Sequence, residues 1–211
     1  MKLFKRTILS LATAVLTAVS AQAIVFDITS DHATGGLGTP PFGTVTLTQN
    51  GLNVDFNVSL TAGYSFVKTG TLELNYFVFN GVGVALSDIV NINQNDPGFT
   101  LSAQTTGGPY GGGGLGDFTF GITSTHGTGG SFPTYLGPLT FTVNNATIAE
   151  LTVPSSGGNI FLVDLLAPNG NTGVADVTTP GTPVPDGGMT VALLGGAFAG
   201  IELLRRKMLK V

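Results

Sequence analysis

The sequence predicts an all-β protein whose body is an antiparallel β-sandwich, and three observations support this prediction. Apolar and polar residues alternate with a period of two in several segments, as they do on strands with one buried and one exposed face. The 32 glycines, and a body that holds few Lys, Arg and Glu residues, disfavour helices. Turn sequences such as Asn80-Gly81 and Asp96-Pro97-Gly98 separate the alternating segments.

The clearest alternation predicts a hairpin near the start of the body. Residues Thr44–Thr48 form its first strand, and Gln49-Asn50-Gly51 forms the turn. The second strand is Leu52–Leu60, in which every second residue is apolar and faces the core: Leu52, Val54, Phe56, Val58 and Leu60. The polar residues between them face solvent. The hairpin is therefore expected to have one solvent-exposed face and one face that packs in the core.

Four later segments complete the expected sheets. Asp117–Ile122 places three apolar residues on one face (Phe118, Phe120 and Ile122), and Leu139–Val143 alternates apolar residues with threonines. Leu72–Phe79 begins with alternation and ends apolar on both faces, as does Ile160–Leu166, and both are expected to be central strands. The chain has no cysteine, so a body of about 150 residues must be stabilised by its hydrophobic core. We predict one such domain, residues 24–175.

The amino end has the composition of a signal peptide, residues 1–23. A basic start (Lys2, Lys5 and Arg6) precedes the apolar stretch Ile8–Val19. Small residues at Ala21 and Ala23 then fit the requirement of signal peptidase, and cleavage after Ala23 leaves Ile24 as the first mature residue. The alternative is a retained transmembrane helix, which the short apolar stretch disfavours.

Three zones follow one another at the carboxyl end. Residues 176–183, rich in Thr and Pro, form a stiff tether. The stretch Met189–Leu204 carries one charge, Glu202, and predicts a single transmembrane helix. At the helical rise it spans about 24 Å, shorter than the ~30 Å apolar layer of a bilayer, so snorkelling basic side chains must make up the difference. The basic residues Arg205, Arg206 and Lys207 stop the segment at a cytoplasmic membrane surface.

This carboxyl end, residues 184–211, resembles the PEP-CTERM class of bacterial sorting tails. The motif Val184-Pro185-Asp186-Gly187-Gly188 is most similar to the VPDSG-type variant of that class, with Gly187 where the variant has Ser. The resemblance implies recognition by an exosortase, a membrane-embedded protease of transpeptidase type. It also implies delivery from the inner membrane, where the tail is transient or retained, to the cell surface or extracellular matrix.

Charge excludes one class of partner. Between Ile24 and Pro183 the only basic residue is Lys68, and ten carboxylates against it give a net charge of −9. Such a body repels nucleic-acid phosphates, so we expect no DNA or RNA partner. The expected partners are signal peptidase, an exosortase and the inner membrane. Extracellular polysaccharide is a further candidate.

Residues that carry catalytic or metal chemistry are few. His32 and His126 lie in Gly/Thr-rich stretches and are expected to be solvent-exposed loop residues, without a nucleophile beside them. Zinc is disfavoured, because the sequence has no cysteine and no closely spaced pair of histidines. Calcium is the ion that the oxygen-bearing side chains fit best, and two sets of residues are candidate ligands. Neither set has the spacing of a calcium-binding loop. We therefore predict no cofactor. The sets are Asp164, Asn169, Asn171 and Asp176, or Asn91, Asn93, Asn95 and Asp96.

Three functions remain open on the sequence. The first is a non-catalytic protein displayed on the surface or released into an extracellular polysaccharide matrix. The second is a glycan-binding module that stacks sugars on loop tyrosines, for which Tyr64, Tyr110 and Tyr135 are the candidates. The third is a secreted hydrolase that depends on His126. We rank them in that order and predict that the protein is not an enzyme.

Overall fold

The computed structural model describes residues 22–72, 74–93, 98–110, 114–125, 134–177 and 182–184, together with Gly195 and Phe198. The chain divides into two compact units, Ala21–Asp186 and a second unit of Met1–Ser20 with Gly187–Val211. The fold below is that of the first unit. The predicted signal peptide lies outside the described residues except for Gln22 and Ala23.

The predicted membrane helix, Met189–Leu204, also lies outside the described residues apart from Gly195 and Phe198, which are both helical. In the part of the chain that the structure describes, no helix has both the length and the apolar character needed to cross a bilayer. The membrane segment therefore stays a prediction from the sequence.

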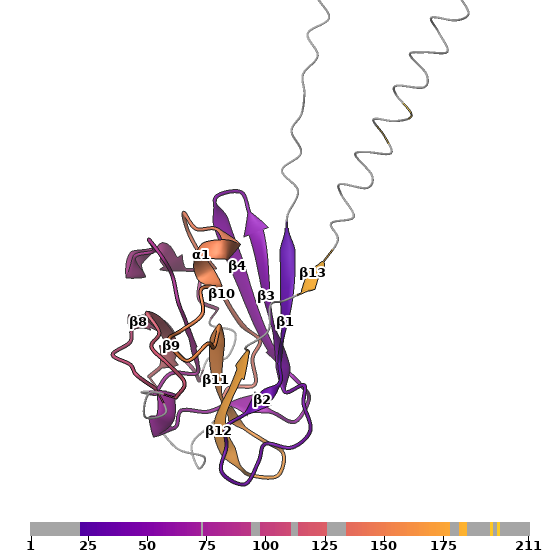
Figure 1. Ribbon diagram of the computed structural model, residues 1–211, viewed down its shortest axis with the longest axis vertical. Coiled ribbons are helices and arrows are strands. Elements are labelled where there is room, and N and C mark those ends of the chain that lie inside the picture. Colours follow the sequence, from indigo (N-terminus) through magenta and orange to yellow (C-terminus); the bar gives the residue numbers. More distant parts are fainter. Residues whose placement is uncertain are drawn as a thin grey trace, which may run out of the picture. The chain divides into compact units, whose positions relative to one another are not determined.

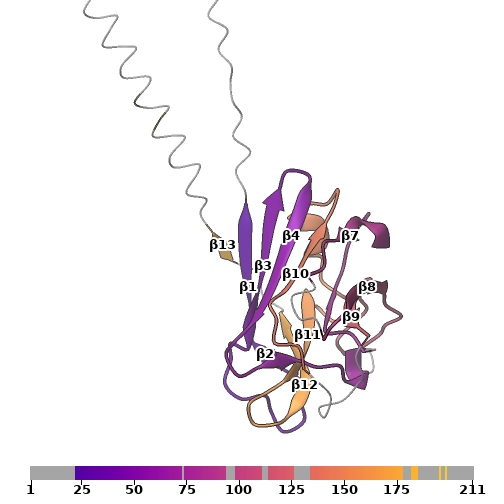
Figure 2. The ribbon, with the colours of Figure 1, turned by 180° about the vertical axis from the view of Figure 1, so that it is seen from behind.

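The first sheet has six antiparallel strands in the order β13-β1-β3-β4-β10-β7 (Figure 1). Their bounds are β1 Ala23–Ile28, β3 Gly43–Asn50, β4 Asn53–Leu60, β7 Ile89–Val90, β10 Leu139–Val143 and β13 Thr182–Val184. The long hairpin β3–β4 lies in the middle, and β13 forms one edge beside β1. Figure 2 shows these strands from behind, with the short β13 next to the start of β1.

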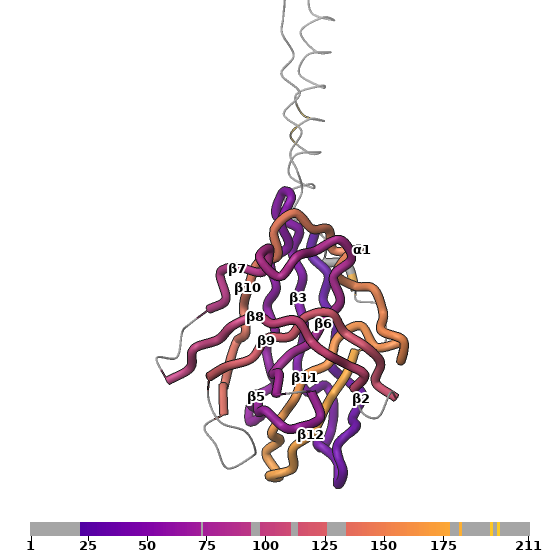
Figure 3. Tube along the Cα trace, turned by 90° about the vertical axis from the view of Figure 1, so that its left-hand side faces the viewer, coloured from indigo at the N-terminus to yellow at the C-terminus, as the bar shows by residue number. Residues whose placement is uncertain are grey.

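The second sheet runs in the order β2-β12-β11-β6-β9-β8, and β5 pairs with β11 off this path. Its strands are β2 Ser30–Asp31, β5 Ser65–Phe66, β6 Phe77–Phe79, β8 Leu101–Thr105, β9 Phe120–Ser124, β11 Phe161–Leu166 and β12 Thr172–Val177. Three short helical turns connect the strands: η1 Gly70–Leu72, η2 Leu86–Asp88 and α1 Ile148–Leu151. In Figure 3 the second sheet crosses in front of β3.

A layer of aromatic rings holds the two sheets together. Phe56 of β4 stacks on Phe141 of β10 in its own sheet, with ring centroids 4.4 Å apart. The same ring reaches Phe79 and Phe161 of the second sheet, at 5.2 and 6.0 Å. All four side chains are buried. Burial of large apolar area of this kind is the main stabilising term for a domain without disulfides, and the fold is an antiparallel sheet-on-sheet sandwich, as predicted.

The strand predictions are confirmed where the alternation is strong. β3, β4, β10 and β11 form within one or two residues of the predicted bounds, and β11 is buried on both faces as a central strand. The hairpin turn is Gly51-Leu52, one residue later than predicted, because Asn50 still pairs with Asn53. Gly51 has φ 62°, the positive value that a type II′ turn needs at its first central position. Leu52 is therefore a turn residue and not part of the core.

Two other predictions are wrong in part. Leu72–Phe79 is not one strand: it begins in η1, Leu74 takes a positive φ of 70°, and only Phe77–Phe79 joins the sheet. Phe118 does not share the face of Phe120 and Ile122. It belongs instead to a second apolar cluster on the outer face of the second sheet, whose buried members are Leu72, Val78, Tyr110, Leu115, Phe118, Leu162 and Val174. This second cluster explains why β11 is buried on both faces.

The ordered sheets extend into the segment assigned to the tether. Asp176 and Val177 are the last residues of β12, and both are buried. Thr182–Val184 then form β13. The first sheet therefore includes the end of the predicted tether and Val184, the first residue of the predicted sorting signal. The division into signal peptide, body, tether and sorting signal stays a prediction as a whole.

Candidate functional site

The pairing of β1 with β13 joins the two ends of the body. In the antiparallel register Ala23 lies opposite Val184, Ile24 opposite Pro183 and Val25 opposite Thr182. Ala23 is the residue after which the sequence predicts signal-peptide cleavage, and Val184 begins the Val-Pro-Asp-Gly-Gly motif. The predicted signal-cleavage residue and the first residue of the predicted sorting motif therefore lie on neighbouring strands of one sheet.

The local sequence accounts for the position of β13 at the edge. Pro183 has no N–H to donate, and proline within a sheet is confined largely to edge strands. β1 lies between β13 and β3, and its Phe26 and Ile28 are buried in the core. The inner strand is thus anchored by its side chains, whereas β13 is held by a three-residue pairing.

The tip of the β3–β4 hairpin lies at the same end of the sandwich. Ala23 pairs with Thr48, Thr48 pairs with Asp55, and the strands close two residues further on, at Asn50 and Asn53. The hairpin tip therefore projects beyond Ala23 and Val184 by about two residues, or roughly 7 Å. We call this end of the sandwich, with the start of β1, the end of β13 and the turn Gly51-Leu52, the terminal end.

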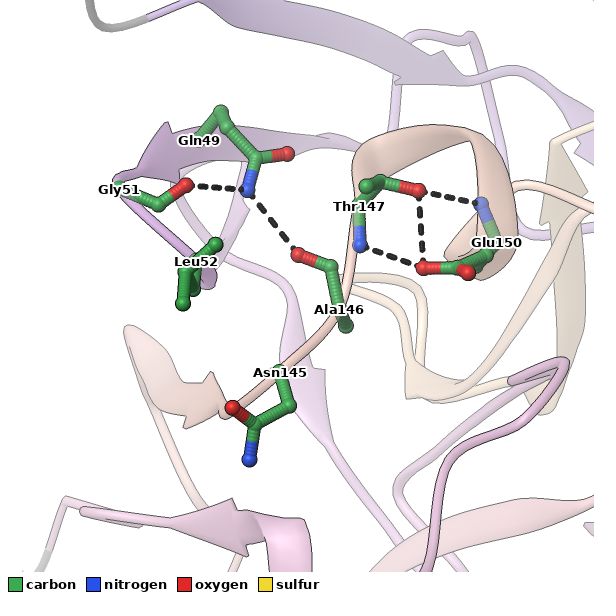
Figure 4. Close-up of a pocket in the computed structure, with 7 residues that line it drawn as sticks. All are labelled: Gln49, Gly51, Leu52, Asn145, Ala146, Thr147 and Glu150. Carbon is green, nitrogen blue, oxygen red and sulfur yellow. Dashed lines mark hydrogen bonds between the residues drawn. The ribbon is translucent and has the colours of Figure 1, made fainter. Parts of the chain in front are cut away.

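The segment Asn144–Glu150 closes the terminal end. Its Ala146 N–H donates to the Leu52 carbonyl at 2.9 Å. The Gln49 side chain bridges the same elements: its amide NH₂ lies 3.1 Å from the Gly51 carbonyl and 3.0 Å from the Ala146 carbonyl, and its oxygen accepts from Ile148 N–H. Figure 4 shows this bridge beside the first turn of α1. One glutamine thus ties the hairpin to the helix.

The Glu150 side chain forms part of the N-terminal cap of α1. The N–H and the hydroxyl of Thr147 donate to its carboxylate at 2.8 and 2.9 Å, which completes a capping box. These hydrogen bonds lower the pKa of Glu150, because they stabilise the charged carboxylate. The carboxylate is therefore ionised and occupied at neutral pH, which makes it a poor general base.

Two shallow cavities flank Gln49. One, of about 260 Å³, is lined by residues that Figure 4 draws: Gln49, Gly51, Leu52, Asn145, Ala146, Thr147 and Glu150. The other, of about 540 Å³, is lined by Gln22, Ile24, Gln49, Gly51, Thr147, Ile148, Ala149 and Thr152. Glu150 is the only titratable side chain in either lining. These cavities offer apolar surface and amide groups, without a pair of groups for acid–base chemistry.

Two carboxylates are buried on the outer face of the second sheet. Asp164 accepts from the Thr69 N–H at 2.5 Å and from the Thr69 hydroxyl at 2.7 Å, and its second oxygen has no partner among the described residues. Burial raises the pKa of Asp164 to about 7, and the two Thr69 hydrogen bonds oppose part of that rise. Asp176 is also fully buried, and its Oδ1 likewise has no described partner. The sequence does not indicate that Asp164 and Asp176 are buried.

His32 does not have the free loop position that was expected for it. Its Nε2 contacts the Oδ2 of Asp176, and its side chain is partly exposed. A His–carboxylate pair is two-thirds of a hydrolase triad, but no serine or threonine hydroxyl among the described residues hydrogen-bonds to His32. His126, on which the hydrolase hypothesis depended, lies outside the described residues.

The tyrosines proposed for sugar stacking are not on the surface, so that prediction is wrong. Tyr64, Tyr110 and Tyr135 are all buried. The Tyr64 hydroxyl donates to the Leu37 carbonyl and that of Tyr135 to the Pro138 carbonyl, and Tyr110 packs beside Phe118. Each ring fills the interior beneath a loop. The sequence around each tyrosine did not reveal its burial, because buried and exposed loop tyrosines have similar local sequences.

The structure also does not assemble the first calcium set. The side-chain amides of Asn169 and Asn171 donate to the carbonyls of Gly35 and Gly36, which ties two loops together. In the second set, Asn95 and Asp96 lie outside the described residues. The Asn93 side chain binds the Tyr135 hydroxyl and the backbone of Pro138 and Thr140. No group of three or more acidic, His or Cys side chains in the described chain is placed to hold a metal.

Of the predicted processing residues, Ala23 and Val184 are the two that the structure describes. Ala21, Pro185, Asp186, Gly187 and Gly188 lie outside the described residues, as do Arg205, Arg206 and Lys207. Sequence reasoning missed the pairing of Ala23 with Val184, whose partners are 161 positions apart. The Thr-Pro-Val run at 182–184 is short, and only the edge of β1 makes it a strand.

Comparison with known proteins identifies the carboxyl end. A family model for the VPDSG-CTERM motif matches residues 183–208, which are a PEP-CTERM-like carboxyl-terminal sorting signal. The match begins at Pro183, inside β13, and covers 26 of the 211 residues. Neither a curated protein nor a solved structure matches the chain.

Proposed function

We propose that this chain is an exported, non-catalytic protein that an exosortase sorts, through its carboxyl-terminal tail, to the cell surface or the extracellular matrix. The match of residues 183–208 to a sorting signal is the observation that carries the proposal. In this account signal peptidase removes residues 1–23, and the stretch Met189–Leu204 holds the chain in the inner membrane. The exosortase then cuts the peptide bond within or just after Val184–Gly188.

The chemistry of the body supports a non-catalytic role. Its carboxylates at the terminal end are occupied: Glu150 caps α1, and Asp88 accepts from the Ala85 N–H. Its two buried carboxylates are engaged separately: Asp164 accepts from the Thr69 N–H and hydroxyl, Asp176 contacts His32, and no described hydroxyl hydrogen-bonds to His32. A glycan-binding role loses its candidate residues, because the three tyrosines are buried.

Variants in the tail test the sorting proposal in cells that carry the matching exosortase. Replacement of Pro185-Asp186 by Ala-Ala removes the centre of the motif, and the uncut protein is expected to accumulate in the inner membrane. Replacement of Arg205-Arg206-Lys207 by glutamines removes the basic stop and is expected to reduce cutting as well. The matched controls are Thr182→Ala, one residue before the match, and Lys210→Gln, two residues after it.

The readout is the size and location of the protein. The controls are expected to be cut and delivered like the parent protein. Equal surface delivery of the motif variant and the controls would rule out sorting through this signal.

A further inference from the structure

Three large apolar side chains are exposed around the terminal end. They are Leu52 at the hairpin tip, Val82 after β6, and Leu86 in η2, with 77%, 55% and 39% of their surfaces exposed. We call them the end patch. Isolated exposed apolar residues are common on proteins, whereas a group of them gathered in one region indicates an interaction surface.

Hydrogen bonds to one segment bring the three together. Ala146 N–H donates to the Leu52 carbonyl at 2.9 Å, and Val82 N–H donates to the Glu150 carbonyl at 3.1 Å. Asn144 N–H donates to the carbonyl of Asp88, the last residue of η2, at 2.9 Å. The segment Asn144–Glu150 therefore contacts the backbones of Leu52 and Val82, and that of Asp88, two residues after Leu86 in the same η2 turn. α1 and the tip of the β3–β4 hairpin lie at the same end of the sandwich in Figure 1.

The charges near the end patch disfavour an anionic partner. The body's single basic residue, Lys68, is buried and donates to the Ser124 carbonyl. The nearby carboxylates, Asp55, Asp88 and Glu150, each accept a hydrogen bond from a neighbouring residue. These carboxylates keep their negative charge when they accept hydrogen bonds, so an anionic partner is disfavoured and an uncharged or zwitterionic surface fits the end patch better.

Chain length places a bilayer within reach of the end patch. From Val184 to Met189, where the predicted membrane segment begins, there are five residue steps, which span at most about 17 Å. The hairpin tip projects roughly 7 Å beyond Val184 in the direction in which β13 leaves the sheet. The connection between β13 and the predicted membrane segment is therefore short enough for the end patch to reach the lipid headgroups when the tail is inserted.

We propose that the end patch inserts into the surface of the bilayer while the tail is still attached. This inference rests on the proposed function, because it needs the tail to be inserted. The occupant is the headgroup–acyl boundary of the lipid, where exposed Leu and Val side chains partition. Attachment through the tail makes weak partitioning sufficient, because the effective concentration of lipid at the patch is high.

The chain has no cysteine, so single cysteines can be labelled with an environment-sensitive fluorophore in the full-length protein. The test position is Leu52→Cys. The matched control is Leu136→Cys, the same residue type with 75% of its surface exposed. Leu136 precedes β10, whose start pairs with Val58 and whose end pairs with Val54 near the hairpin, so Leu136 lies at the opposite end of the sandwich. A third variant, Val191→Cys, reports on the tail.

The three proteins are reconstituted in phosphatidylcholine vesicles with and without a lipid that carries a nitroxide just below the headgroup. The expected result is a blue shift and loss of emission for the probe at 52, no change at 136, and quenching at 191. Combined Val82→Asp and Leu86→Asp substitutions, both at exposed positions, are expected to restore the emission at 52. High salt is expected to leave the quenching at 52 unchanged.

The outcomes separate the two proposals. Quenching at 191 without quenching at 52 overturns membrane docking and leaves the sorting proposal standing. A blue shift at 52 without nitroxide quenching indicates a protein partner or a second copy and also overturns docking. No quenching at 191 means that the tail is not inserted, which overturns the anchored state and docking together.

Discussion

Ala23 and Val184 lie opposite each other in the register of β1 and β13. Val184 is the second residue of the matched sorting signal. Ala23 is the last residue of the predicted signal peptide. Cleavage after Ala23 takes away the strand partner of Val184 but leaves Ile24 opposite Pro183 and Val25 opposite Thr182. The predicted signal-peptide cleavage is therefore expected to loosen the chain where the matched sorting signal begins.

We expect this loosening to be measurable as hydrogen exchange. Soluble chains that end at Gly188 and begin at either Gln22 or Ile24 are compared by mass spectrometry. The backbone amides of Thr182 and Val184 are expected to exchange several-fold faster in the shorter chain, because one residue pair at the end of a strand contributes about 1 kcal/mol. Exchange across β11 and β12 serves as the control and is expected to be the same in both chains. Equal exchange at 182–184 would show that Ala23 does not hold Val184.

Asp164 is expected to make stability depend on pH. Its pKa in the folded protein is about 7, above the ordinary aspartate value of 3.8, so the folded state binds the proton more tightly than the unfolded state. The contribution is fully present below about pH 4 and is lost as the pH rises to 7, with a total of roughly 4 kcal/mol. Denaturant unfolding of the tail-free body across this range measures it.

The variant Asp164→Asn cannot ionise and is expected to flatten that decline. Asp27→Asn, on an exposed position of β1, controls for the loss of a carboxylate and is expected to change stability by no more than about 0.5 kcal/mol at pH 8. An unchanged slope between pH 4 and 7 in Asp164→Asn would mean that another group causes the pH dependence.

The contact of His32 with Asp176 is expected to be structural. Asp176 is fully buried, its Oδ2 contacts His32, and its Oδ1 has no described partner. His32→Ala therefore leaves a buried carboxylate without its side-chain partner, at an expected cost of about 1–3 kcal/mol. Asp176→Asn in the same background is expected to recover part of this loss, which a double-mutant cycle measures. Additive effects of the two changes would show that the pair is not coupled.

Phe56 is expected to be the most costly single truncation between the two sheets. Its ring contacts Phe141 in its own sheet and Phe79 and Phe161 in the other. Phe56→Ala is expected to lower the free energy of unfolding by about 3–5 kcal/mol. Leu136→Ala removes a side chain of which 75% is exposed and is expected to cost less than about 0.5 kcal/mol. Similar midpoints for the two variants in urea would contradict a core centred on Phe56.

The sequence predicted the strands in which side-chain alternation is itself the cause of the structure. β4 and β10 alternate because one face meets the aromatic layer around Phe56 and the other meets solvent. The same reasoning failed for Leu72–Phe79, where Leu74 leaves the extended region and Asn75 is buried with its side chain bonded to the Leu72 carbonyl. Apolar composition alone does not show such a break in the backbone.

The parts of the site that depend on distant partners were not predictable. β13 is a strand only because β1 offers an unpaired edge, and nothing in Thr-Pro-Val shows that edge. His32 and Asp176 are 144 positions apart and meet because β2 pairs with β12. The tyrosines were predicted to be exposed for the same reason, since the loops that cover them come from elsewhere in the chain. The sorting signal, in contrast, is local in sequence, and both the resemblance and the family match found it.

The most direct test of the sorting account is mass spectrometry of both termini of the protein recovered from the cell surface or the extracellular medium. We predict an amino terminus at Ile24 and a new carboxyl terminus within or just after Val184–Gly188. A surface protein that still ends at Val211 would contradict exosortase processing, and a cytosolic product that retains residues 1–23 would contradict export itself.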